Sequence, residues 1–125
     1  RGNDLLIYAC TSGYPVEFQD VCLLEINKLK EKYFDSIGGI GFSGHHLGIA
    51  VDIAAITLGA SWIERHFTMD RTWKGTDHAA SLEPEGLRKL SRDMKNVDLA
   101  LTYKPKDILD VEEVQRKKLK WSQSN

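Results

Sequence analysis

The apolar positions of this chain fall into three short runs that predict buried strands. DLLIYAC, at 4–10, is compact and apolar, and Gly and Thr-Ser-Gly bound it. A shorter glycine-rich run at 37–43 and the run WIERHFT at 62–68 predict a second and a third strand. Because helical patterns separate these runs, the three strands should be parallel and joined by right-handed crossovers.

Between and after the strands, apolar residues recur at the three- and four-residue spacing of amphipathic helices. The first set predicts one helical face and consists of Phe18, Cys22, Ile26, Leu29 and Tyr33. The nearly all-apolar run 47–60 predicts a well-covered helix that ends at Gly59 as its C-cap. Pro84 suits a first helical turn. The third apolar face then consists of Leu87, Leu90, Met94, Val97 and Leu101.

Composition and charge narrow the class of protein. The 125 residues allow one domain at most, and 42% hydrophobic with 28% charged residues is an ordinary globular balance. A formal net charge of -1 gives no reason to expect nucleic acid or a membrane as a partner. No apolar run reaches the length of about 18 residues that a membrane span needs, and no signal-peptide pattern opens the chain, so we expect a cytoplasmic protein.

Two cysteines are too few for a disulfide framework, so Cys10 and Cys22 are predicted to be small core residues. A strand follows Arg1 almost at once, which predicts a chain cut from something longer. The lysine-rich segment 104–125 is predicted to be a solvated polar tail.

The third strand helps to choose between two α/β architectures, an open doubly wound sheet and part of a (β/α)-barrel. Alternation puts Glu64 and His66 on one face of this strand and Arg65 on the other. Both faces of a parallel sheet are normally covered, so a polar face is costly unless it lines a site. The mouth of a barrel provides such a site, and the barrel is therefore favoured.

Polar side chains gather at the carboxyl ends of the predicted strands, where barrel enzymes keep their sites. They are Ser12, Tyr14, Ser43, His45, Glu64, His66, Asp77 and His78. Because His45 and His66 follow neighbouring strands, their imidazoles could bind one divalent ion such as Mn²⁺, Zn²⁺ or Fe²⁺. Two protein ligands would leave coordination positions open for a substrate.

Each histidine also has a simpler interpretation. His45 could bond to the backbone at the start of a helix, and His66 could be satisfied by Glu64 or by a carbonyl. His46 is expected to point elsewhere and to have a structural role. His78, with Trp73 and Lys74, could lie in an ordinary exposed loop. The spacing alone therefore leaves a metal site and a set of structural histidines both open.

Three motifs, found in this order along the chain, favour the metal site over structural histidines. CTSGYP, GFSGHH and WIERHFTMDRTWKGTDHAASLEP closely resemble the sialic acid synthase family, from about residue 4 to about residue 101. The resemblance implies a transferase with a TIM (β/α)₈ barrel. Such an enzyme joins phosphoenolpyruvate to the aldehyde of an N-acetylmannosamine-type amino sugar, or its 6-phosphate, and releases phosphate.

The same resemblance implies roles for individual residues. His45 and His66 match the family's two metal ligands, with Mn²⁺ the expected ion and Mg²⁺ or Co²⁺ the alternatives. Glu64 would join these two histidines as a catalytic residue. The matching substrate-binding residues are Ser43, for phosphoenolpyruvate, together with Ser12, Tyr14 and Asp77. Some family members have asparagine where this chain has Ser12.

The resemblance also implies what the chain lacks. Residues 1–103 would form the last three β/α units of the barrel, and no antifreeze-like domain follows the tail at 104–125. The basic residues that hold phosphoenolpyruvate come mostly from earlier units, so we expect the chain to be inactive alone and the full-length protein to be a homodimer. The alternatives are a related synthase that makes a shorter 3-deoxy sugar acid, a non-catalytic half-barrel that binds a partner, and a metal-dependent barrel hydrolase.

Overall fold

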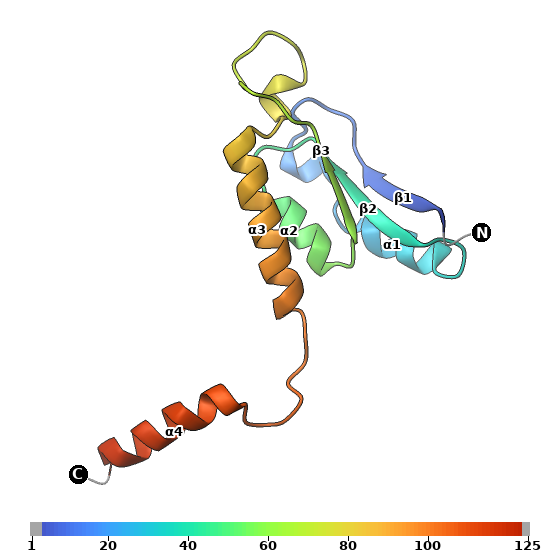
Figure 1. Ribbon diagram of the computed structural model, residues 1–125. Helices are drawn as coiled ribbons and strands as arrows, with labels where there is room; N and C mark the ends of the chain where they lie inside the picture. Colours follow the sequence, from blue (N-terminus) through green and yellow to red (C-terminus); the bar gives the residue numbers. More distant parts are fainter. Residues whose placement is uncertain (1–3, 124–125) are drawn as a thin grey trace.

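Three parallel strands form the centre of the molecule (Figure 1). The computed structural model describes residues 4–123. The strands are β1 (Leu6–Cys10), β2 (Gly39–Gly44) and β3 (Trp62–Arg65), and they lie in the order β1-β2-β3. All three predicted strands and their parallel pairing are confirmed, and the fold class is α/β.

Helices cover one face of this sheet. The helices α1 (Glu25–Tyr33) and α2 (Ala50–Thr57) pack on the strands, and α3 (Pro84–Ala100) packs against α2. The core between them consists of Ala9, Val21, Ile26, Ile40, Phe42, Ala55 and Ala60. Alternate strand residues supply this core, as a half-covered sheet requires.

The other face of the sheet has no helix on it among residues 4–123. Leu6 and Trp62 are exposed there, Trp62 by 54%. On β2, Gly41 lies between Tyr8 of β1 and Trp62 of β3 in the register, and a Cβ atom at this position would overlap the ring of Tyr8. The aromatic ring therefore fills the space that a larger residue at 41 would need.

The end of α2 agrees with the prediction at Gly59. This glycine has a φ of 107°, and its N–H donates to the carbonyl of Ile56 at 2.9 Å. The next N–H, of Ala60, donates to the carbonyl of Ala55 at 3.0 Å. These two bonds form the Schellman arrangement, which satisfies carbonyls that the helix leaves open and needs a residue able to adopt positive φ.

The first predicted helix is wrong in its first half. Residues Phe18–Asp20 form a separate short 3₁₀ helix, η2, and α1 begins only at Glu25. Between them Cys22 has a φ of 49°, which turns the chain out of the helical path and leaves Phe18 exposed by 60%. The regular spacing of apolar residues runs across this break, so the pattern alone could not reveal it.

The prediction that Cys10 and Cys22 are small core residues is wrong, because both are exposed. Cys22 is exposed at the turn before α1, and Cys10 is exposed at the end of β1. The pairing of β1 with β2 puts Cys10 opposite Ser43, on the face of the sheet that carries no helix. Alternation along β1 thus decides the exposure of Cys10, because its neighbour Ala9 takes the core position.

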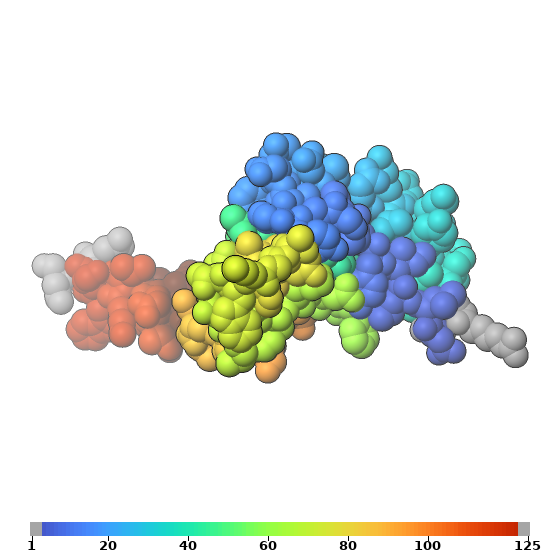
Figure 2. Space-filling view, turned by 90° about the horizontal axis from the view of Figure 1, so that it is seen from above, coloured from blue at the N-terminus to red at the C-terminus, as the bar shows by residue number. Residues whose placement is uncertain are grey.

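The predicted polar tail contains a further helix, α4 (Asp110–Gln123), which a linker separates from α3 (Figures 1 and 2). Glu112 accepts a hydrogen bond from the backbone N–H of Leu109 at 2.7 Å, and this bond starts the helix. Acidic residues in the first turn also stabilise this N-terminal end through the helix dipole. Among residues 4–123 no helix is both long and apolar enough to span a membrane.

Candidate active site

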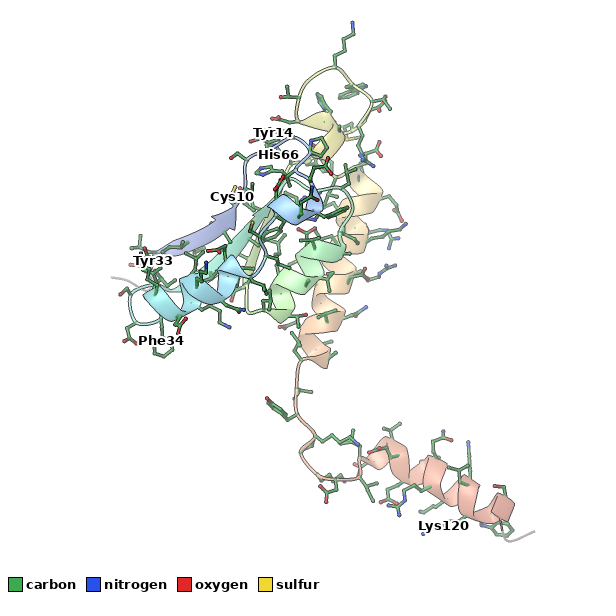
Figure 3. The ribbon with its side chains drawn as sticks, turned by 180° about the vertical axis from the view of Figure 1, so that it is seen from behind. Cys10, Tyr14, Tyr33, Phe34, His66 and Lys120 are labelled. Atoms are coloured by element: carbon green, nitrogen blue, oxygen red, sulfur yellow. The ribbon has the colours of Figure 1, made fainter. Side chains whose placement is uncertain are left out.

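The loops that follow the three strands meet at one end of the sheet. The backbone N–H of Val16, after β1, donates to the carbonyl of His45, after β2, at 2.9 Å. Figure 3 shows Tyr14 and His66 close together at this end, with Cys10 just below them at the end of β1. The carboxyl ends of parallel strands therefore bring these segments together, as the sequence predicted.

Two imidazoles and a phenol ring form the centre of this cluster. The ring centroids of His45 and His66 are 5.3 Å apart. The ring of Tyr14 lies edge-on to both, at 4.7 Å from His45 and 5.8 Å from His66. Three residues from two loops and one strand end thus converge.

A backbone carbonyl fixes the protonation pattern of His45. Its Nδ1 atom lies 2.9 Å from the carbonyl oxygen of Thr11, and the side chain is buried, with only 5% of the residue exposed. A carbonyl can only accept, so Nδ1 donates, and in the neutral ring the lone pair is then on Nε2. Histidines that bind metals commonly use the second nitrogen for such a bond, which orients the ring and sets its tautomer.

His66 is paired with a carboxylate. Its Nδ1 atom lies 4.0 Å from Oδ2 of Asp77, and both side chains are about half exposed. Asp77 directly precedes a short 3₁₀ helix, η3 (His78–Ala80). The carboxylate of Asp77 also accepts a hydrogen bond from the hydroxyl of Thr76 at 2.9 Å, which holds it near the imidazole.

Ser43 and Glu64 are neighbours in the register of β2 and β3. The hydroxyl of Ser43 is buried and donates to Oε1 of Glu64 at 2.8 Å. Glu64 itself is exposed on the face of the sheet without helices. The serine therefore orients a carboxylate that remains accessible to a bound molecule.

The other predicted residues take different places. Ser12 is exposed in the loop after β1. His46 turns away from the cluster and is fully buried, so its predicted structural role is confirmed. His78 is only half-buried, and its Nδ1 atom lies 2.8 Å from the hydroxyl of Thr68. The ring of Trp73 lies edge-on to His78, so these two residues order the loop after β3.

The donor set fits a divalent ion with open coordination positions. His45 and His66 offer imidazole nitrogens, which Mn²⁺, Co²⁺ and Zn²⁺ accept. No group of three or more His, Cys, Asp or Glu side chains among residues 4–123 is arranged to hold a metal. A site with two protein ligands would leave further positions for water and substrate oxygens.

Two buried charged residues behind the site were not predicted. Arg65 and Asp52 form an ion pair at 2.6 Å, and their side chains are 3% and 0% exposed. The sequence did contain a signal for each. Asp52 is the one acidic residue in an otherwise apolar helix, and Arg65 falls on the strand face that should be apolar. A buried charge needs a partner, so the two could have been paired.

Comparison with known proteins identifies the group to which these motifs belong. A model of the NeuB family matches residues 1–106, which is most of the chain. The chain belongs to the NeuB family. The resemblance to sialic acid synthases in the sequence is therefore confirmed.

Named relatives of this NeuB-family chain make several nonulosonic acids. It is 47% identical over 110 residues to N-acetylneuraminate-9-phosphate synthase of Homo sapiens, covering 88% of this chain and 30% of the human protein. It is 38% identical over 97 residues to N,N'-diacetyllegionaminic acid synthase of Legionella pneumophila, covering 78% of this chain and 26% of that protein. The chain thus spans less than a third of the length of these relatives.

A solved structure has the same arrangement of elements. The N-acetylneuraminic acid synthetase of Leptospira borgpetersenii superposes on this NeuB-family chain with a TM-score of 0.73 at 33% sequence identity. The superposition covers 90% of this chain and 38% of that structure. The strands and helices described above are therefore arranged like part of that synthetase.

Proposed function

We propose that this chain carries the metal-binding and acid–base residues of a nonulosonic acid synthase. The enzyme would condense phosphoenolpyruvate with an N-acetylmannosamine-type sugar, or its 6-phosphate. The observation that supports this proposal is the convergence of His45, His66 and Tyr14 beside a carboxylate that Ser43 holds. All of these residues lie within residues 1–106, which the NeuB family model matches.

The proposal includes the rest of a TIM barrel. The sheet has three strands, its two outer strands β1 and β3 each have one unpaired edge among residues 4–123, and one face carries no helix. In a (β/α)₈ barrel both edges pair with further strands, and the bare face lines the interior. The greater length of the relatives supports this arrangement, in which residues of other units would complete the substrate site.

His45 and His66 would hold the divalent ion, Mn²⁺ in the first place, with Mg²⁺ or Co²⁺ as alternatives. A bound ion would supply Lewis acid chemistry, which lowers the energy of negative charge developing on the sugar's aldehyde oxygen. Thr11 and Asp77 would act through the imidazoles. The carbonyl of Thr11 directs Nε2 of His45 to the site, and the carboxylate of Asp77 faces Nδ1 of His66.

In the proposed reaction a carbon–carbon bond forms between C3 of phosphoenolpyruvate and the aldehyde carbon. The aldehyde oxygen takes up a proton to become a hydroxyl, and water adds to C2. The C2 hydroxyl then loses its proton as the bond between C2 and the phosphate oxygen breaks, which leaves the keto acid and free phosphate. Glu64 is the group that would accept the proton of the attacking water, since its carboxylate is accessible and oriented by Ser43. Tyr14 and Asp77 would contact the sugar, Ser43 would contact phosphoenolpyruvate, and Ser12 would add a further polar contact to substrate.

A chimeric enzyme tests this function. This chain would replace the 110-residue segment that it matches in the human synthase, so that the other barrel units are present. Phosphate release from phosphoenolpyruvate would be followed with Mn²⁺ and N-acetylmannosamine, then with the 6-phosphate of that sugar. The 125-residue chain alone would be assayed beside the chimera.

We expect sugar-dependent phosphate release from the chimera that a chelator abolishes, and none from the chain alone. A folded chimera that releases no phosphate with either sugar would overturn the proposed function. Release by the chain alone would contradict the need for further barrel units. Release with a shorter aldose but not with the amino sugars would favour a synthase of 3-deoxy sugar acids.

A further inference from the structure

Arg65 connects the segments that carry the candidate active site. It lies between Glu64 and His66 in the sequence, but its side chain points to the helix-covered side of the sheet, where it meets Asp52 of α2. This side chain is 3% exposed. A guanidinium so deeply buried needs several acceptors, and the identity of these acceptors shows what it holds.

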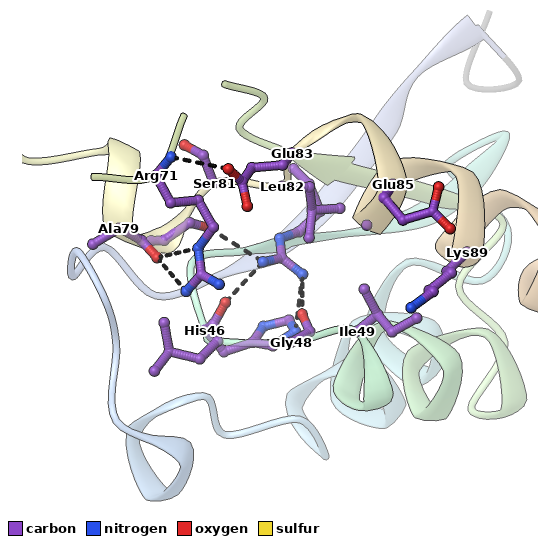
Figure 4. A pocket seen from close by; sticks show the side chains of 14 residues that line it. His46, Gly48, Ile49, Arg71, Ala79, Ser81, Leu82, Glu83, Glu85 and Lys89 are labelled. Atoms are coloured by element: carbon purple, nitrogen blue, oxygen red, sulfur yellow. Dashed lines mark hydrogen bonds between the residues drawn. The ribbon is translucent and has the colours of Figure 1, made fainter. Parts of the chain in front are cut away.

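Two carbonyl acceptors lie in the loop after β2, directly behind His45. Nη2 of Arg65 donates to the carbonyl of His46 at 2.8 Å, and Nη1 donates to the carbonyl of Gly48 at 2.7 Å. Nη1 also lies 3.2 Å from the Nε2 atom of His46 in the same loop. Figure 4 shows the carbonyl groups of His46 and Gly48 with their hydrogen bonds as dashed lines. The last residue of β3, just before His66, is therefore bonded to the residue that follows the other imidazole, His45.

The remaining acceptors lie in two further elements. Nη1 donates to Oδ2 of Asp52, in α2, at 2.6 Å. Nη2 donates to the carbonyl of Ala80, in η3, at 3.2 Å. Because η3 begins one residue after Asp77, this bond ties the turn that carries the carboxylate partner of His66 to the same guanidinium.

We propose that Arg65 is the positioning residue of the two-histidine site. Its planar fork has fixed donor directions, so bonds to three carbonyls and one carboxylate fix the relative positions of the loop after β2, the end of β3 and η3. These three segments carry His45, His66 and Asp77. The inference rests on the proposed metal site, and it names a residue that touches neither ligand nor substrate.

A lysine at this position separates positioning from charge. Arg65→Lys keeps the positive charge opposite Asp52, but a single ammonium group cannot reach acceptors in three elements with the fixed geometry of guanidinium. A role in stability alone would lower the midpoint of unfolding and leave the site of the folded protein unchanged. The measurements are therefore made on the 125-residue chain at a temperature at which each variant is folded.

Two readouts report on the site itself. The first is the nuclear Overhauser effect between ring protons of His45 and His66, whose centroids are 5.3 Å apart. The second is the affinity for Co²⁺, followed by its visible absorption. Substitution of a residue that orients metal ligands typically weakens metal affinity by about 10–100-fold. We therefore expect Arg65→Lys to weaken Co²⁺ binding about tenfold and to reduce the Overhauser signal between the two rings.

Arg88→Lys is the matched control, because Arg88 is exposed on α3 and pairs with Glu85. This variant should change neither readout. If Arg65→Lys does not fold, Asp52→Asn serves in its place, since it removes the charged acceptor and leaves the bonds of Arg65 to the carbonyls. We expect a smaller loss of Co²⁺ affinity in Asp52→Asn.

An unchanged ring-to-ring signal and unchanged Co²⁺ affinity in folded Arg65→Lys, or in Asp52→Asn where that variant replaces it, would overturn the inference. A wild-type chain that shows no ring-to-ring signal would also overturn it. The outcome is separate from that of the chimera assay. A chimera without phosphate release would refute the proposed synthase, and a selective loss in Arg65→Lys would still support the positioning role.

Discussion

At the scale of single residues, each group in the candidate active site has a partner that restricts what it can do. The carbonyl of Thr11 leaves Nε2 of His45 as the available nitrogen. The hydroxyl of Ser43 occupies one oxygen of Glu64, while the residue remains open to solvent. These partners come from different strands and loops, so the chemistry of each residue depends on the fold that surrounds it.

Glu64 is the residue whose removal should affect turnover most directly. In the chimera, Glu64→Gln keeps the size of the side chain and an acceptor for Ser43 but removes the proton acceptor. We expect turnover to fall by about 10²–10⁴-fold, the usual range for loss of a general base. Steady-state phosphate release measures it.

Glu25→Gln is the control for that experiment, because Glu25 is an exposed carboxylate on α1 that pairs with Lys28. It should leave turnover unchanged. If Glu64→Gln retained near-normal turnover, Glu64 would have no acid–base role, and water activation would have to be assigned to another group.

The loop after β3 contains a carboxyl group with a shifted pKa. The hydroxyl of Thr72, and then its backbone N–H, donate to Asp70 and lower the pKa of its carboxyl group. A carboxyl group whose pKa is lower in the folded chain stabilises the fold above its unfolded pKa, and this contribution is lost as the pH falls through the folded pKa. The contribution of Asp70 to the order of this loop should therefore be lost under acidic conditions.

Thr72→Val removes the hydroxyl and should raise the pKa of Asp70 towards its ordinary value. Carbon-detected NMR titration of the Asp70 carboxyl group measures this directly. Thr76→Val, which removes a hydroxyl bonded to Asp77, should leave Asp70 unaffected. An Asp70 titration that is identical in the wild type and Thr72→Val would show that this hydrogen bond does not form in solution.

At the scale of secondary structure elements, the end of α2 is set by the backbone rather than by side-chain packing. Gly59→Ala would place a Cβ atom at a φ of 107° and within 2.7 Å of the amine of Lys30. That amine donates to the carbonyl of Leu58, another open carbonyl at this helix end. We expect a loss of about 1 kcal/mol in the free energy of unfolding.

Urea unfolding of the chain measures this loss, and Gly86→Ala is a matched comparison. Gly86 lies in the first turn of α3, where a Cβ atom would make only ordinary contacts with Leu82. Alanine there should be stabilising, by about 0.5 kcal/mol. Equal effects of the two substitutions would show that positive φ at position 59 does not determine where α2 ends.

The same scale shows how much of the fold could be predicted. Strands and the third helix were predictable because their patterns are long, regular and bounded by Gly or Pro. The first helix was not, because Cys22 adopts positive φ at a position where the apolar spacing continues unbroken. Helix α4 was missed because its residues have little apolar contact in the described chain, and charge alone indicated a solvated segment.

The candidate active site was predictable only where it depends on the strand pattern. Strand alternation and the rule that sites follow the carboxyl ends of parallel strands placed His45, His66 and Glu64 together. Most acceptors of Arg65 could not be predicted, because three of them are backbone carbonyls, which have no signature in a sequence. The tautomer of His45 depends on another such carbonyl, that of Thr11.

At the scale of the whole molecule, the uncovered sheet face and the outer strand edges should govern behaviour in solution. Leu6 and Trp62 are exposed on that face, and β1 and β3 offer unpaired backbone groups. Such surfaces favour association between chains. We expect the 125-residue chain to form larger species as its concentration rises, which sedimentation velocity can follow.

Trp62→Lys should reduce this association, since a charged residue on an outer strand opposes strand pairing and apolar contact. Leu99→Lys, on an exposed position of α3, is the control and should have little effect. A chain that stays monomeric at every concentration would show that the uncovered face is tolerated in water.

The short distance in sequence between the two imidazoles has a consequence for how the site assembles. His45 and His66 are 21 positions apart, and one helix separates the two strands that they follow. Closing a loop of this length costs little chain entropy, and contacts of short sequence separation form early in folding. The two imidazoles should therefore come together with a single strand–helix–strand unit, before strands far apart in the chain have met. In a longer protein of the proposed kind, this unit would be able to bind the proposed ion before the rest of the barrel has closed.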